Sequence, residues 1–97
     1  MASKRLQRRR DALEWVVGHL PDASRFTTHD VMMQAEILDG SKWPPYFKIA
    51  YKRVAGDGAV SLGGMLSRHP RYEKHPDGLV STSMRGSRTR SQLWRTR

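Results

Sequence analysis

The spacing of the apolar residues changes once along this chain, after Pro70. Before Pro70, apolar residues recur at three- and four-residue steps in segments separated by Pro and Gly, as in helices that bury one face. After it, RYEKHPDGLVSTSMRGSRTRSQLWRTR has no helical periodicity, and its last residues alternate as a half-buried strand does. The sequence therefore predicts an α+β, mostly helical fold that ends in a two-stranded β-hairpin.

Four helices are expected before Pro70. They span about residues 4–20, 28–39, 45–55 and 59–69, with Pro21 and Gly40 as stops for the first two. Their candidate N-cap residues are Ser3 for the first, Thr27 or Thr28 for the second, and Asp57 or Ser61 for the fourth. Gly63 and Gly64 each weaken the fourth helix by about 1 kcal/mol relative to Ala. Two glycines would be explained if another backbone, from protein or from nucleic acid, lies close to this helix.

The expected hairpin follows the helices. Residues 71–75 are expected to form a short strand and residues 76–78 (Pro-Asp-Gly) a turn. Residues 79–89 are expected to form a long polar loop, because they contain Gly, Ser and Arg without apolar periodicity. In the final strand we expect Leu93 to pack into the core and Trp94 to seal a sheet edge or support the loop.

Length and composition limit the class of protein. A chain of 97 residues suffices for one domain, and the absence of Cys excludes disulfides and thiolate metal sites. The longest purely apolar run, Trp15–Val17, is far too short to span a bilayer. The basic N-terminus lacks the apolar segment of a secretory signal. These features predict a cytoplasmic protein with no membrane partner.

The charge distribution indicates the class of partner. The net charge is +9 and the isoelectric point is near 10.9, which suits a polyanion. Residues 1–10 and residues 78–97 each carry five basic and no acidic residues, whereas the part between them is nearly neutral. A surface without a polyanionic partner would mix the two signs more evenly. Nucleic acid is therefore the expected partner.

The sequence offers little for catalysis or metal binding. The four His residues, at positions 19, 29, 69 and 75, lack Cys or carboxylate companions at ligand spacing. A Gly-rich phosphate loop, a His-Glu-x-x-His helix and a pair of carboxylates suited to acid–base chemistry are all missing from the sequence. We therefore expect a protein that is not an enzyme and has no cofactor, metal or small-molecule substrate.

The segments RFTTHDVMMQAEI, VSLGGMLSRHPRYEK and SRTRSQLWR, in this order, resemble the winged helix-turn-helix group of DNA-binding domains. The resemblance covers residues 11–97, with residues 1–10 as a basic extension that begins the first helix. It implies double-stranded DNA as the partner, a recognition helix at about 59–69, a basic wing at about 79–90, and a nucleoid-associated regulator of transcription. The segment Lys42 to Gly58 is longer than the usual turn before the recognition helix. The sequence therefore leaves open whether the helix at 45–55 or the helix at 59–69 enters the groove.

The DNA major groove admits one helix, and the phosphates on either side attract cations. With Leu62, Met65 and Leu66 turned inward, the opposite face of the fourth helix would meet base edges, and Arg68 is the best candidate to read a guanine. The candidate DNA-binding residues are Ser61, Gly64, Ser67, Arg68 and Arg71 on or beside the fourth helix, Arg85, Arg88 and Arg90 in the wing, and Arg8, Arg9, Lys48 and Lys52 on the first and third helices.

Two other functions remain open from the sequence. The protein could coat DNA as an architectural factor by charge alone, without reading bases. It could instead use the same scaffold to bind a protein through an exposed apolar face, for which Trp43, Tyr46 and Phe47 are the candidates. Neither a dimer interface nor a heptad repeat is visible in the sequence, so homodimer formation is open as well.

Overall fold

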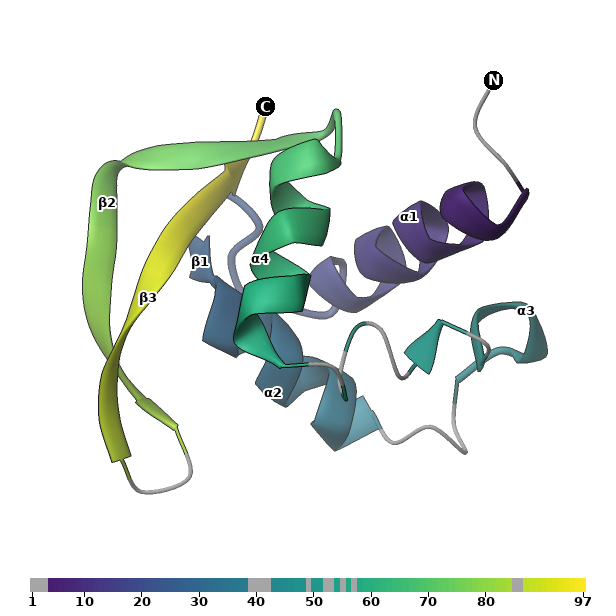
Figure 1. The fold of residues 1–97 in the computed structure, drawn as a ribbon, viewed down its shortest axis with the longest axis horizontal. Coiled ribbons are helices and arrows are strands. Elements are labelled where there is room, and N and C mark those ends of the chain that lie inside the picture. The colour runs from purple at the N-terminus through teal and green to yellow at the C-terminus, as the bar shows by residue number, and fades with distance from the viewer. Residues whose placement is uncertain are drawn as a thin grey trace.

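A computed structural model describes residues 4–38, 43–48, 50–51, 54, 56, 58–84 and 87–97 of the chain. Its elements, in chain order, are α1 (Lys4–Val17), β1 (Phe26–Thr27), α2 (Thr28–Leu38), α3 (Pro45–Lys48), α4 (Ala59–Arg68), β2 (Tyr72–Met84) and β3 (Ser87–Thr96) (Figure 1). The expected α+β class is confirmed, since the described residues contain four helices and one antiparallel sheet.

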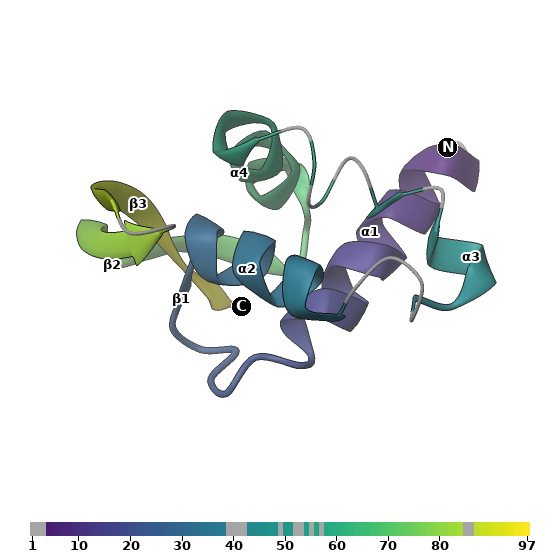
Figure 2. The same ribbon diagram turned by 90° about the horizontal axis from the view of Figure 1, so that it is seen from below.

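The helices lie to one side of the sheet, and the β2–β3 hairpin projects beyond them (Figures 1 and 2). The core fills the space between α1, α2, α4 and the base of the sheet. Apolar residues from each of these elements are almost fully buried there, including Leu13, Val16, Phe26, Val31, Leu62, Leu66 and Trp94. Helix α3 lies beside α1 at the end of the molecule opposite the hairpin (Figure 2).

The sheet has a third strand that the sequence analysis did not predict. Its strand order is β1-β3-β2, and β1 pairs with β3 through Phe26 opposite Trp94 and Thr27 opposite Leu93. Both Leu93 and Trp94 are buried, but Trp94 belongs to the main core cluster and Leu93 lies outside it. The expectation of Trp94 as an edge residue was therefore wrong, because β1 covers that edge of β3.

The expected turn at residues 76–78 and the expected loop at 79–89 were also wrong. β2 continues through the expected turn and as far as Met84, and β3 begins at Ser87. The register of the β2–β3 pair breaks between Lys74, opposite Trp94, and Leu79, opposite Gln92. The Pro-Asp-Gly sequence forms a bulge, with Gly78 at a φ of 70°, a conformation that favours glycine. Figure 1 shows β2 turning a corner there. The described residues of the segment expected as a wing therefore form a β-ribbon rather than a loop.

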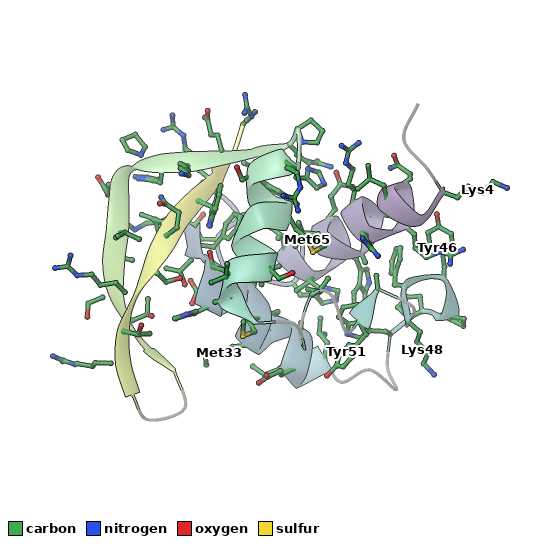
Figure 3. The ribbon with its side chains drawn as sticks, in the orientation of Figure 1. Lys4, Met33, Tyr46, Lys48, Tyr51 and Met65 are labelled. Carbon is green, nitrogen blue, oxygen red and sulfur yellow. The ribbon has the colours of Figure 1, made fainter. Side chains whose placement is uncertain are left out.

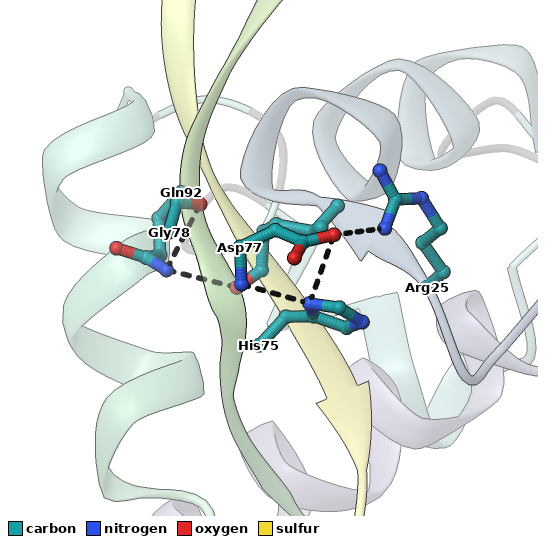
Figure 4. Close-up of polar contacts among 6 residues, drawn as sticks. Arg25, His75, Asp77, Gly78 and Gln92 are labelled. Atoms are coloured by element: carbon teal, nitrogen blue, oxygen red, sulfur yellow. Dashed lines mark hydrogen bonds and ion pairs between the residues drawn. The ribbon is translucent and has the colours of Figure 1, made fainter.

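Polar contacts fix this bulge to the segment between α1 and α2 (Figure 4). Arg25 donates to the Asp77 carboxylate at 2.7 Å, and the Asp77 amide donates to His75 Nδ1 at 3.1 Å. On the other side, Gln92 Nε2 donates to the Gly78 carbonyl at 3.3 Å. The hairpin is thus tied to the helical part of the molecule at its base, which sets the direction in which it projects.

The N-terminus of α2 is capped by one of the two residues that the sequence predicts. The Thr27 hydroxyl accepts the Asp30 amide at 3.0 Å, and the Asp30 carboxylate accepts the Thr27 amide at 2.9 Å. This reciprocal pair is a capping box, so Thr27 is the cap. Helix α1 ends at Val17, before Pro21, whereas the expected cap Ser3 and the expected stop Gly40 lie outside the described residues.

The predicted helix at 45–55 is supported in part, whereas the prediction for the start of α4 needs correction. Helix α3 spans Pro45–Lys48, and of the described residues beyond it Tyr51 is α-helical and Val54 and Gly56 are π-helical. The Val54 amide also donates to the Ala50 carbonyl at 3.1 Å. The N-cap of α4 is Gly58, at a φ of 94° and without a side-chain cap, so Ser61 is not the cap. Asp57, the other candidate cap, lies outside the described residues.

Aromatic rings join α1 to the segment around α3. Trp15 packs edge-on against Trp43 with ring centroids 5.3 Å apart, and Trp43 in turn packs against Tyr51 at 4.9 Å. Trp43 is only 2% exposed. Of the three residues expected to form an apolar face for protein binding, Trp43 is therefore turned inward, whereas Tyr46 is 49% exposed and Phe47 is half-buried.

Among the described residues, no helix is both long enough and apolar enough to cross a membrane.

Candidate nucleic-acid interface

Helix α4 divides into a buried and an exposed face. Leu62 and Leu66 are 0% exposed, and Met65 is half-buried between α4 and α1 (Figure 3), so the three expected inward residues do face the protein. On the opposite side, Val60 is 93% exposed, and Ser67 and Arg68 are exposed as well. Of the residues expected to face outward, Ser67, Arg68 and Arg71 are exposed, whereas Ser61 and Gly64 are half-buried.

The two glycines of α4 are not explained by packing within the chain. A Cβ atom at Gly63 would meet nothing within 4 Å, and one at Gly64 would meet only the Arg68 guanidinium, at 3.3 Å. No other protein backbone approaches either position within the described residues. Because these glycines cost helix stability without admitting a neighbouring helix, their exposed surface is free for an external molecule.

A shallow groove of about 200 Å³ separates α4 from the hairpin. Val60 and Gly63 lie on its α4 side, and Arg90 lies on its β3 side. The first residues of α2, Thr28 and His29, form its floor together with neighbouring strand residues. The groove therefore sets an arginine of the wing across from the exposed start of α4.

Hydrogen bonds across the floor hold the two sides of this groove together. The Trp94 indole N–H donates to the Thr28 hydroxyl at 2.9 Å, and the His29 amide donates to the Ser91 hydroxyl at 3.3 Å. His29 Nδ1 also lies 2.9 Å from the Thr82 hydroxyl on β2. The start of α2 thus binds both strands of the hairpin, and the hairpin is positioned relative to α4 through α2.

On its other side, α4 meets α1 at a second, smaller pocket of about 50 Å³. Its apolar lining includes Leu13 and Met65, and three arginines surround it. We call these residues, Arg9, Arg10 and Arg68, the arginine cluster. In the described part of the chain none of the three makes an ion pair, although the Glu14 carboxylate lies 3.7 Å from His69 Nε2 and His69 lines the same pocket.

The wing arginines are similarly free. Arg88 and Arg90 on β3 are exposed and lie opposite Ser83 and Ser81 of β2. No ion pair involves either side chain within the residues that the structure describes. Arginines without an ion pair therefore lie on two sides of α4. Arg88 and Arg90 lie on the hairpin side, and the arginine cluster lies on the α1 side.

His69 fixes the junction between α4 and α1 behind the arginine cluster. It is 3% exposed, its Nδ1 accepts the Arg71 amide at 3.0 Å, and its Nε2 lies 3.3 Å from the Arg10 carbonyl. This arrangement suits a neutral ring that carries its proton on Nε2. Burial lowers the pKa of His69 from its ordinary value of 6.5, against the opposing effects of the Arg10 carbonyl and Glu14.

Several of the sequence-predicted residues are engaged elsewhere. Arg71 pairs with Glu14 at 3.3 Å, and Arg8 lies over the Tyr46 ring at 4.8 Å. Lys48 lies with Tyr46 at the α3 end of the molecule, away from the hairpin (Figure 3). Arg85 and Lys52 lie outside the described residues. The structure brings together Ser61, Gly64, Ser67 and Arg68 on α4, and sets them between Arg9 and the wing residues Arg88 and Arg90.

Arg10 and Val60 were not among the candidate DNA-binding residues, although the helical pattern already placed Val60 on the outer face of the fourth helix. Arg9 and Arg10 each lie three or four residues from both Leu6 and Leu13. Helical spacing therefore places both arginines on the same face of α1 as these leucines. Arg8 lies off that face. This spacing could have identified Arg10, whereas the groove beside Val60 depends on the hairpin, whose path the sequence did not predict.

An apolar depression of about 290 Å³ lies on the outer side of α2. Met33 and Ile37, 38% and 69% exposed, line it together with Asp22, Asp30 and residues of the α1–α2 connection. It faces away from the hairpin groove.

No three His, Asp or Glu side chains of the described residues lie close enough together to hold a metal ion.

Comparison with protein-family models, curated proteins and solved structures finds no match to this chain.

Proposed function

We propose that this protein binds double-stranded DNA, with α4 in the major groove and the β2–β3 hairpin acting as a wing on the flanking backbone or minor groove. One observation carries the proposal. The outer face of α4 exposes Val60 and Ser67 and lies between two groups of arginines that have no carboxylate partner among the described residues. On this proposal the chain is a winged helix-turn-helix protein, as its sequence motifs suggest.

The proposal accounts for the charge pattern physically. A helix in the major groove has a phosphate backbone on either side, and each backbone attracts cations. The arginine cluster would meet one backbone, and Arg88 and Arg90 would meet the other or the adjacent minor groove. Phosphate contacts of this kind hold a protein in position, while contacts to base edges read the sequence. Repulsion among the clustered arginines would be relieved when phosphates bind.

The structure also favours α4 over α3 as the inserted helix. Helix α3 spans four residues, Pro45–Lys48, and it packs beside α1. Helix α4 spans Ala59–Arg68 and exposes its outer face next to the wing. A recognition helix must present an exposed face to base edges, and the exposed face of α4 beside the hairpin fits this requirement.

We propose a role as a small regulator of transcription because Ser67 and Arg68 are exposed beside the glycine-bearing face, where polar groups can reach base edges. An architectural protein that coats duplex DNA would use the same arginines without this reading. The two roles separate on base-pair substitution within a bound site, which costs a reader about 1–3 kcal/mol per mismatch and a coating protein almost nothing.

The test of the interface is duplex binding measured by fluorescence anisotropy over a range of salt concentrations. The variant Arg88→Ala with Arg90→Ala should weaken binding and reduce the dependence of log K on log salt by about two units, since each lost phosphate contact removes about 0.9. The matched control is Lys4→Ala with Lys48→Ala, which removes the same charge from the α1–α3 end. Equal effects of the two double variants would show that only net charge matters and would reject the wing.

A further inference from the structure

Val60 has a distinctive place in the proposed interface. It lies in the first turn of α4, two residues after Gly58, and it is the most exposed large apolar side chain among the described residues. A single exposed valine is ordinary on a protein surface. This one, however, forms part of the wall of the groove that faces Arg90, and Gly63, one turn further along, leaves it without a neighbouring side chain.

The polar residues around Val60 already have partners within the chain. Thr28, Ser91 and Gln92 line the same groove, and each makes a hydrogen bond to another part of the protein. The helix side of the groove, formed by Ala59, Val60 and Gly63, is apolar. Arg90 is the charged residue of the groove, and it stands on the opposite wall. This part of α4 can therefore make an apolar contact with a base.

The major groove presents one suitable apolar group. Thymine carries a methyl group at C5, whereas the other groups by which the groove is read are hydrogen-bond donors and acceptors. Val60 is 93% exposed, and a Cβ atom at Gly63 in the next turn would meet nothing within 4 Å. The methyl groups of Val60 are therefore open to a base on the Gly63 side, while the Arg68 guanidinium covers Gly64 on the other side.

We propose that Val60 contacts thymine methyl groups in the major groove and gives the protein a preference for A·T base pairs at that position. This inference rests on the proposed function, because Val60 reaches a base only if α4 enters the groove. It assigns to Val60 a role in specificity that is separate from the phosphate contacts of the arginines.

The experiment compares two short duplexes that differ only in methyl groups. One alternates dA and dT, and the other carries deoxyuridine in place of every dT, so hydrogen-bonding groups and charge are unchanged. Affinities are measured by fluorescence anisotropy at one fixed salt concentration. Burying a methyl group gives about 0.8 kcal/mol, so the wild-type protein should bind the deoxyuridine duplex about fourfold more weakly.

The variants Val60→Ala and Ile37→Ala make the test specific. Val60→Ala removes the exposed methyl groups and keeps a good helix former, so it should bind the dA·dT duplex about fourfold more weakly and no longer distinguish the two duplexes. Ile37→Ala removes another exposed apolar side chain, 69% exposed, from the outer side of α2 and should keep both the affinity and the preference.

The outcomes separate the inference from the proposed function. Equal wild-type affinity for both duplexes, with salt-dependent binding retained, overturns the role of Val60 and leaves DNA binding standing. A preference that survives in Val60→Ala also overturns it, because the methyl group is then read by another residue. Absence of binding to either duplex by the wild-type protein rejects DNA binding itself.

Discussion

The indole N–H of Trp94 donates to the hydroxyl of Thr28 at 2.9 Å, and both residues are buried. This bond joins the first turn of α2 to the last strand, 66 residues away in the sequence. It connects the helical core to the strand that carries the wing arginines. The position of Arg88 and Arg90 relative to α4 therefore depends on a contact in the interior of the protein.

Loss of this bond should destabilise the fold. Thr28→Val keeps the shape of the side chain but leaves the buried indole N–H without an acceptor, which costs about 1–3 kcal/mol. Chemical denaturation of the variant should show a free energy of unfolding lower by that amount. Thr89→Val, at an exposed position on the hairpin, is the matched control and should change little. Similar stability of Thr28→Val and the wild type would mean that the bond contributes nothing.

Gly63→Ala should separate stability from binding. A Cβ atom at this position meets nothing within 4 Å, so alanine should stabilise α4 by about 0.5–1 kcal/mol. The same methyl group would stand between α4 and the DNA groove and should lower duplex affinity several-fold. Thermal unfolding and fluorescence anisotropy measure the two effects. A variant that is more stable and binds DNA as tightly as the wild type would exclude this face of α4 from the interface.

His69 should make stability depend on pH. Its pKa in the folded protein lies below 6.5 because burial disfavours the charged ring. The unfolded chain therefore takes up this proton at a higher pH than the folded chain does. The stabilisation is fully present above about pH 6.5 and is lost as the pH falls through the folded pKa. Thermal unfolding between about pH 7 and about pH 5 should show the loss, and it should be smaller in His69→Gln. An identical pH dependence in both proteins would refute the assignment.

Arg68 should determine which sequences are preferred. It is exposed at the end of α4, and its guanidinium can donate two hydrogen bonds to a guanine edge. Selection from random duplexes at near-physiological salt should give a different preferred sequence for Arg68→Ala than for the wild type. Selection that enriches no sequence with the wild-type protein would instead identify a DNA-coating protein.

The helical part of the fold was largely predictable because its signals are local. The capping residues Thr27 and Asp30, and the spacing of Leu62 and Leu66, act within one or two turns, and α2 and α4 lie close to where they were expected. The helix expected at 45–55 is matched at Pro45–Lys48 and at the helical residues Tyr51 and Val54. The packing of Trp43 between Trp15 and Tyr51 was not predictable, because it joins segments distant in the sequence.

The sheet was less predictable because its determinants are distant in the sequence. β1 spans only Phe26 and Thr27 and exists through pairing with β3. Pro76, Asp77 and Gly78 have the composition of a turn, and the Arg25–Asp77 ion pair holds them as a bulge instead. The candidate arginines could be proposed from charge alone. The pairing of Arg71 with Glu14 and the stacking of Arg8 on Tyr46 could not, because these contacts require the assembled fold.

An NMR titration of the labelled protein with duplex DNA tests the proposed interface most directly. The amide signals of Val60, Gly63 and Ser67 on α4, and of Arg88 and Arg90 on β3, should shift together, while those of Tyr46 and Lys48 at the α3 end should remain in place. Shifts confined to the α3 end, or spectra that do not change when DNA is added, would contradict the insertion of α4 beside a basic wing.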